Sequence, residues 1–101
     1  MEEKMEKYAA ILEENIKEHG VVEETVIAME ECAELIQAIS KVKRYGFVGA
    51  YKDNLIEEIA DVDIVITELL MAFNVTEEEF FSVLGRKIKR IKSRIEGKFK
   101  I

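Results

Sequence analysis

Apolar residues recur at spacings of three and four along most of the chain, which is the period of an amphipathic α-helix. Glycines and one Asn-Val-Thr segment interrupt this pattern and divide it into separate stretches. We therefore expect four helices, over residues 2–19, 22–45 and 52–73 and from residues 74–76 onward.

The predicted helix ends rest on a few residues. Gly20 follows the first helix, and Gly46 and Gly49 interrupt the pattern after the second, so we expect a loop of about five to eight residues there. Thr76 and Glu79 form a T-x-x-E capping box at the start of the fourth helix.

Helical projection also predicts which faces are buried. The second helix has its main apolar stripe at Val22, Val26, Met29, Ala33 and Ile36. The third helix has one ridge, about 80° wide, that includes two acids among core residues. The ridge comprises Asn54, Glu58, Asp61, Val65, Leu69 and Ala72. The fourth helix has an apolar row at Phe80, Leu84, Ile88, Ile91 and Ile95.

Composition supports an all-α fold. The chain has 101 residues, no proline, five glycines, 49% hydrophobic residues and 36% charged residues, a mixture that favours long helices. Residues 1–101 form one expected domain, a four-helix bundle-like protomer. A domain of this size buries a modest core, so we expect its helices to pack into a dimeric or tetrameric core.

Charge is distributed unevenly along the chain. Residues 1–85 carry 7 basic and 20 acidic side chains, whereas residues 86–101 carry 8 basic and 1 acidic. The acidic balance argues against a nucleic-acid partner. Without a secretory signal or a long apolar stretch, we expect no membrane association. A single cysteine, Cys32, excludes an intramolecular disulfide and favours the cytoplasm; we expect it to fill the core.

Two pairs of acids lie three residues apart on separate predicted helices, Glu31 with Glu34 and Glu58 with Asp61. Residues three apart share a helix face. Four carboxylates brought together by two packed helices would repel one another, and a divalent cation resolves that conflict. Oxygen ligands favour Mg²⁺, with Mn²⁺ as a substitute. The absence of a Glu-x-x-His pair argues against a di-iron bundle.

The opposing interpretation is that these acids are solvated, because acid pairs at this spacing arise often by chance in a chain with 21 acids. The positions of Glu58 and Asp61 on an apolar ridge favour the metal site. Lys87, Arg90 and Arg94 share one face of the last helix and suit a phosphate clamp.

The segments EECAEL at 30–35 and EEIADV at 57–62 resemble the paired E-E-x-x-E and E-x-x-D motifs of the MazG-type, all-α nucleoside triphosphate pyrophosphohydrolases. The segments "HG" at 19–20, "ELIQAISK" at 34–41 and "VLGRKIKRIKSR" at 83–94 fit as well. The resemblance covers residues 19–96.

The resemblance implies a Mg²⁺-dependent enzyme that cleaves a nucleoside triphosphate between its α- and β-phosphates. Glu31, Glu34, Glu58 and Asp61 then resemble metal ligands. It also implies supporting roles for further residues. Those are Glu30 and Glu57, which would support the ligands or orient the attacking water, and Lys87 and Arg94, which would contact phosphate; Arg90 joins them from the helical face. Ile91 stands where many relatives carry Asn, so the resemblance does not predict the base or sugar.

Two alternatives stay open at this point. The first is phosphoribosyl-ATP pyrophosphohydrolase, a related small helical enzyme, although the basic C-terminal segment and the double-Glu motif fit it less well. The second is a helical interaction module without activity, in which the acidic ridge binds a basic partner or pairs with the basic helix. Such a module would be indifferent to Mg²⁺.

Overall fold

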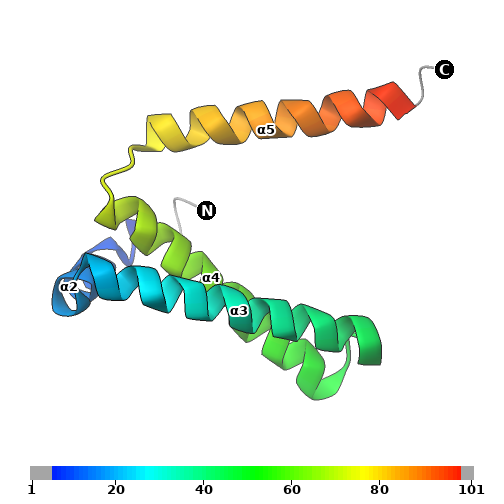
Figure 1. Ribbon diagram of the computed structural model, residues 1–101, viewed down its shortest axis with the longest axis horizontal. Coiled ribbons are helices and arrows are strands. Elements are labelled where there is room, and N and C mark those ends of the chain that lie inside the picture. The colour runs from blue at the N-terminus through cyan, green and yellow to red at the C-terminus, as the bar shows by residue number, and fades with distance from the viewer. Residues whose placement is uncertain (1–5, 99–101) are drawn as a thin grey trace.

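The computed structural model describes residues 6–98, and all of its regular elements are helices (Figure 1). The helices are α2 (Ala9–His19), α3 (Val21–Tyr45), α4 (Gly49–Ala72) and α5 (Glu77–Lys98). No strand occurs between residues 6 and 98. The all-α fold class is therefore confirmed, and each helix lies where the apolar period predicts one. Of the predicted first helix, residues 2–5 lie outside the described residues, and Lys7 and Tyr8 form a turn, so α2 begins at Ala9.

Glycines end the first two helices. Gly20 has φ 81° and donates its backbone N–H to the Ile16 carbonyl at 2.7 Å, while Gly46 has φ 98° and donates to the Val42 carbonyl at 2.8 Å. A positive φ of this kind is accessible to glycine without steric cost. These two positions therefore separate α2 from α3 and stop α3 at Tyr45.

The loop between α3 and α4 is shorter than predicted. It comprises residues 46–48 alone, because α4 begins at Gly49, three residues before the expected start. Gly49 adopts φ 52°, and the next turn is closed when Tyr51 and Lys52 donate their N–H groups to the Val48 carbonyl. Gly49, at the first position of α4, thus makes the turn into the helix. The loop can therefore be shorter than the sequence pattern predicts.

Helices α3 and α4 pack against each other as an antiparallel hairpin, and α2 packs against both near the end where α4 finishes (Figure 1). The buried apolar residues of this three-helix unit are Leu12, Ala28, Ala38 and Val65. Two of them are alanines on α3, and small side chains allow two helix backbones to approach closely. The long contact between α3 and α4 is what positions the candidate site.

The bulky apolar stripe predicted for α3 does not form the core of the chain. Val22, Met29 and Ile36 are 80%, 65% and 68% exposed, and Val26 and Ala33 are also exposed. Burial follows the opposite face of α3 instead, which carries Ala28 and Ala38. The two alanines on this face are small, and small side chains are what a close helix contact requires.

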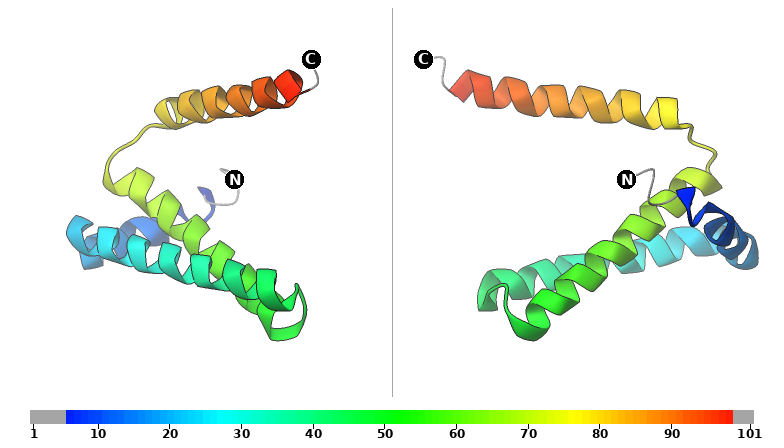
Figure 2. Two further views of the ribbon diagram at one scale, coloured as in Figure 1. Left: turned by 45° about the vertical axis from the view of Figure 1, so that its right-hand side comes forward. Right: turned by 180° about the vertical axis from the view of Figure 1, so that it is seen from behind.

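Helix α5 stands apart from the other three. It runs away from the end of α4 in each of three views and packs along none of the remaining helices (Figure 2). The radius of gyration is 16.8 Å, against about 13 Å for a compact chain of this length. Residues 6–98 contain four helices, but within one chain α5 does not complete a bundle with the other three.

The start of α5 is capped as predicted. The Thr76 hydroxyl accepts the backbone N–H of Glu79 at 3.1 Å, and a Glu79 carboxylate oxygen accepts the Thr76 N–H at 2.9 Å and its hydroxyl at 3.0 Å. These bonds favour the ionised carboxylate, so the Thr76 backbone N–H and then its hydroxyl lower the pKa of Glu79. The capping box is confirmed.

Among the helices that the structure describes, none is long and apolar enough to cross a membrane.

Candidate functional site

The four predicted carboxylates converge between α3 and α4. Glu31, Glu34, Glu58 and Asp61 each offer one oxygen, and these oxygens all lie within 4.8 Å of one another. Two oxygens on opposite sides of one Mg²⁺ lie about 4.2 Å apart, because Mg²⁺ holds its ligands at about 2.0–2.1 Å, so the four oxygens approach the spacing of a single cation site and reach it with a small movement of the side chains. The structure therefore brings together the four residues predicted as metal ligands.

Two features of the hairpin produce this geometry. The spacing of three residues places Glu31 beside Glu34 on α3, and Glu58 beside Asp61 on α4. The antiparallel packing then sets the two pairs against each other, with Glu31 near Asp61 and Glu34 near Glu58. Each pair alone is common on helix surfaces. The site forms because the packing of α3 against α4 places the two pairs opposite each other.

The electrostatics of the cluster favour a bound cation or proton. Partial burial, followed by the charge of Glu34, raises the pKa of Glu31, and the same two causes raise the pKa of Glu58. One carboxylate oxygen of Glu31 and one of Glu58 are buried without a hydrogen-bond partner. Orphaned carboxylate oxygens beside like charges are unfavourable, so the residues present fit a divalent cation.

The cluster is open on one side. Glu31, Glu58 and Asp61 are half-buried, whereas Glu34 is exposed. Glu30 and Glu57, predicted to support the site, are also exposed and are not among the converging carboxylates. Cys32 is exposed rather than packed in the core, because it lies on a side of α3 that none of the described helices covers. That expectation was wrong.

The basic stripe does not join the carboxylates within one chain. Lys87, Arg90 and Arg94 are exposed on α5, which packs along none of the other helices (Figure 1). Among residues 6–98, the one ion pair within 4.0 Å joins Lys92 and Glu96, both on α5. The predicted phosphate clamp and the predicted metal site are therefore separate surfaces of a single chain.

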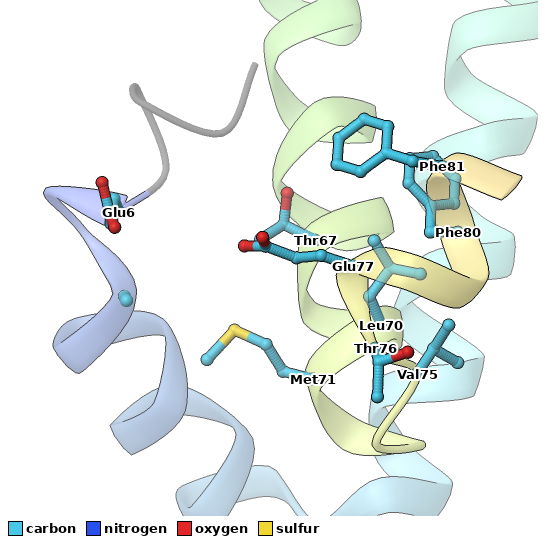
Figure 3. Close-up of a pocket in the computed structure, with 10 residues that line it drawn as sticks. Glu6, Thr67, Leu70, Met71, Val75, Thr76, Glu77, Phe80 and Phe81 are labelled. Atoms are coloured by element: carbon cyan, nitrogen blue, oxygen red, sulfur yellow. The ribbon is translucent and has the colours of Figure 1, made fainter. Parts of the chain in front are cut away.

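A pocket lies elsewhere in the molecule, between the start of α2, the end of α4 and the first turns of α5 (Figure 3). Its volume is about 250 Å³, and none of the carboxylates of the cluster lines it. Its lining is mainly apolar and includes Ala9, Leu70, Met71, Val75, Phe80 and Phe81. The pocket lies between the first turns of α5 and the ends of α2 and α4, and it offers few groups for chemistry.

A second acidic pair was missed by the helical patterns. Glu24 on α3 and Glu68 on α4 are only 1% and 2% exposed, and they are the largest fully buried side chains of the described chain. A signal for them was present, since Glu24 precedes Glu31 by seven residues and Glu68 follows Asp61 by seven. Seven residues are two helical turns, so both acids continue the faces that carry the cluster.

Comparisons of the chain with protein-family models, with curated proteins and with solved structures find no match.

Proposed function

We propose that this chain is a Mg²⁺-dependent nucleoside triphosphate pyrophosphohydrolase that converts an NTP or dNTP to the monophosphate and pyrophosphate. The observation that carries the proposal is the convergence of four carboxylates, from two helices, with oxygens within 4.8 Å of one another. Support also comes from the resemblance of the EECAEL and EEIADV segments to the MazG-type motifs.

In this proposal Glu31, Glu34, Glu58 and Asp61 hold the cation, with Mn²⁺ as a possible substitute for Mg²⁺. When bound, the cation neutralises phosphate charge and lowers the pKa of a coordinated water. A carboxylate beside the cluster, Glu30 or Glu57, orients the attacking water and accepts its proton. The water cleaves the bond between the α- and β-phosphates, and pyrophosphate leaves.

The basic side chains of α5 would act on the carboxylate cluster of a second copy of the chain. Lys87, Arg90 and Arg94 would contact the phosphates, yet α5 does not reach the cluster in a single chain. A homodimer or homotetramer in which α5 of one copy covers the hairpin of another joins the basic and acidic surfaces. It also covers apolar side chains that one chain leaves exposed, among them Met29 and Ile36 on α3 and Ile88, Ile91 and Ile95 on α5.

The decisive experiment is an assay of pyrophosphate release over a wide panel of NTPs and dNTPs, with Mg²⁺ or Mn²⁺. We expect release from at least one nucleotide, dependent on the cation and abolished by EDTA. Including phosphoribosyl-ATP in the panel separates the related enzyme of that specificity from the proposed one. No release from any nucleotide, together with no metal binding, would contradict the proposal.

An interaction module without activity is the competing function, and the exposed apolar residues of α3 and α5 are the observation that favours it. A thermal-shift titration with Mg²⁺, with and without a nonhydrolysable triphosphate, separates the two. The enzyme is expected to be stabilised by Mg²⁺ and further by the triphosphate. A module that only binds a protein partner would respond to neither ligand.

A further inference from the structure

Glu24 and Glu68 form a sealed acidic pair under α2. Glu24 lies in the first turn of α3 and Glu68 near the end of α4, where α2 packs against both helices. Their exposed fractions of 1% and 2% mean that bulk water reaches neither carboxyl group. Two ionised carboxylates in such surroundings would repel each other without compensation from solvent.

The hydrogen bonds of the pair are unequal. One oxygen of Glu68 accepts a hydrogen bond from the side-chain amide of Asn15, on α2, at 2.7 Å. Both oxygens of Glu24 are buried without any partner. An acceptor-only carboxylate in that position is costly, whereas a protonated carboxyl group has an O–H to donate.

The charges facing Glu24 favour its protonated form. Glu68 faces it from α4 and His19 from α2. Burial and then the negative charge of Glu68 raise the pKa of Glu24, and this rise is only partly opposed by His19. Neither acid has an ion-pair partner within 4.0 Å among residues 6–98.

We propose that Glu24 is protonated in the folded protein and donates its O–H to Glu68, so that the two side chains share one proton and one negative charge. Asn15 binds the same carboxylate from α2. The hydrogen bonds that join Glu24, Glu68 and Asn15 thus act as a proton-dependent latch, which holds α2 on the hairpin. It is distinct from the metal site proposed above, whose carboxylates lie two helical turns away along both helices.

The reason that α2 depends on this latch is the small size of its buried surface. Leu12 is the one buried residue of α2, so a hydrogen bond to a buried carboxylate contributes a large share of the attachment. When Glu24 ionises, two negative charges face each other beneath α2. Detachment of α2 then admits water to both carboxylates.

The test compares Glu24→Gln with Glu23→Gln, a matched change at the adjacent, exposed glutamate of α3. Glutamine reproduces the shape of the protonated acid and provides an N–H donor to Glu68. Hydrogen exchange of the α2 amides is measured with EDTA between pH 5 and pH 9, comparing wild type and variant at each pH. We expect α2 to open at least about tenfold less often in Glu24→Gln than in wild type at pH 9, which corresponds to a pKa difference of one unit, with little difference at pH 5.

Glu23→Gln should match the wild type at every pH. Equal protection of α2 in wild type and Glu24→Gln at pH 9 would overturn the proposal. The Asn15→Ala variant provides an independent measurement, because it removes the hydrogen bond to Glu68 without changing either acid. It should increase opening of α2 about tenfold at pH 5, where the latch is intact. An unchanged opening rate in this variant would show that α2 does not depend on the latch.

A bound cation in place of the proton is the competing explanation, and a salt titration separates the two. Sodium or potassium is varied at pH 8 and constant ionic strength, with EDTA present, in wild type and Glu24→Gln. A shared proton predicts the same small response in both proteins. Selective stabilisation of the wild type by one cation would overturn the proposal in favour of a monovalent cation site.

Discussion

The two acidic clusters of the hairpin differ in access to solvent more than in chemistry. Both use carboxylates from the same faces of α3 and α4, at positions two helical turns apart along each helix. The cluster of Glu31, Glu34, Glu58 and Asp61 has an exposed member and lies in the part of the hairpin that α2 leaves free, whereas Glu24 and Glu68 lie beneath α2 and are closed to water. An open cluster allows a hydrated cation to enter, while a sealed pair has room for a proton.

This difference shows that like charges at a helix interface can be tolerated in two ways. Each way requires something that neutralises part of the charge, because several ionised carboxylates in a partly desolvated space raise one another's pKa. Four converging carboxylates suit a divalent cation, and two carboxylates suit one shared proton. If the two regions are separate, a substitution in one of them should leave the behaviour of the other unchanged.

The largest effect should come from neutralising one carboxylate of the open cluster. Glu34→Gln and Asp61→Asn each remove a ligand charge from the proposed metal site, so pyrophosphate release should fall by at least ~100-fold. Steady-state assays with the best nucleotide measure the loss, and circular dichroism checks that the helices are retained. Glu24→Gln is the matched control from the sealed pair and should keep its activity. Equal losses in both regions would show that the two clusters act as one.

The next effect should come from the basic face of α5, which is proposed to cover the open cluster of another copy. Arg90→Glu reverses a charge on the basic face of α5 and should weaken both substrate binding and self-association, raising KM roughly tenfold. Sedimentation velocity measures the oligomeric state alongside the kinetics. Lys92→Glu is the matched reversal, since Lys92 is rotated by about 200° from Arg90 on the same helix. If the two variants behave alike, the basic face has no special role.

A smaller effect is a change in the Mg²⁺ response with pH. The pKa values of Glu31 and Glu58 are raised in the folded chain, so without metal their contribution to stability is fully present below the unfolded value of about 4.3. It is lost as the pH rises through the folded values. A bound cation favours the ionised form, so Mg²⁺ should raise Tm more at pH 8 than at pH 5.

Thermal unfolding with EDTA or Mg²⁺ at the two pH values measures this difference. Glu24→Gln should retain the Mg²⁺ response because the open cluster is intact, whereas Asp61→Asn should lose it. A Mg²⁺ response that disappears in Glu24→Gln would place the cation in the sealed pair and reverse the assignment of the two regions.

The smallest effect should be confined to α5, outside both acidic regions. Thr76→Ala removes the capping hydroxyl and should destabilise the first turn of α5 by about 1 kcal/mol. Hydrogen exchange at residues 77–80 detects the fraying. Thr76→Ser keeps the hydroxyl and should preserve the protection, and neither variant should alter exchange in α2. Propagation of the change into α2 would show that α5 supports the three-helix unit.

Much of the fold follows from short-range features of the sequence. The apolar period predicts the helices, Gly20 and Gly46 mark two of their ends, and Thr76 with Glu79 marks the start of α5. These features are readable because each depends on a few neighbouring residues: a periodic face, a positive φ or a local hydrogen bond. The i, i+3 pairs of carboxylates are local in the same sense.

The buried faces were harder to predict. The bulky stripe of α3 includes Met29 and Ile36, yet these side chains are exposed and the buried apolar residues of α3 are Ala28 and Ala38. Glu68 is buried as well, and it extends the ridge of Asp61 and Val65 on α4. A sequence pattern records hydrophobicity by residue, whereas burial depends on how closely two backbones approach.

The helices, their caps and the two carboxylate pairs follow from interactions within a few turns of one chain segment. Only the packing of the helices brings the pairs of α3 and α4 together, seals Glu24 with Glu68 under α2 and sets α5 apart from the other helices. The physical reason is that the alignment of two packed helices and the coverage by a third are long-range properties. They determine which carboxylates share a space and whether water can enter it.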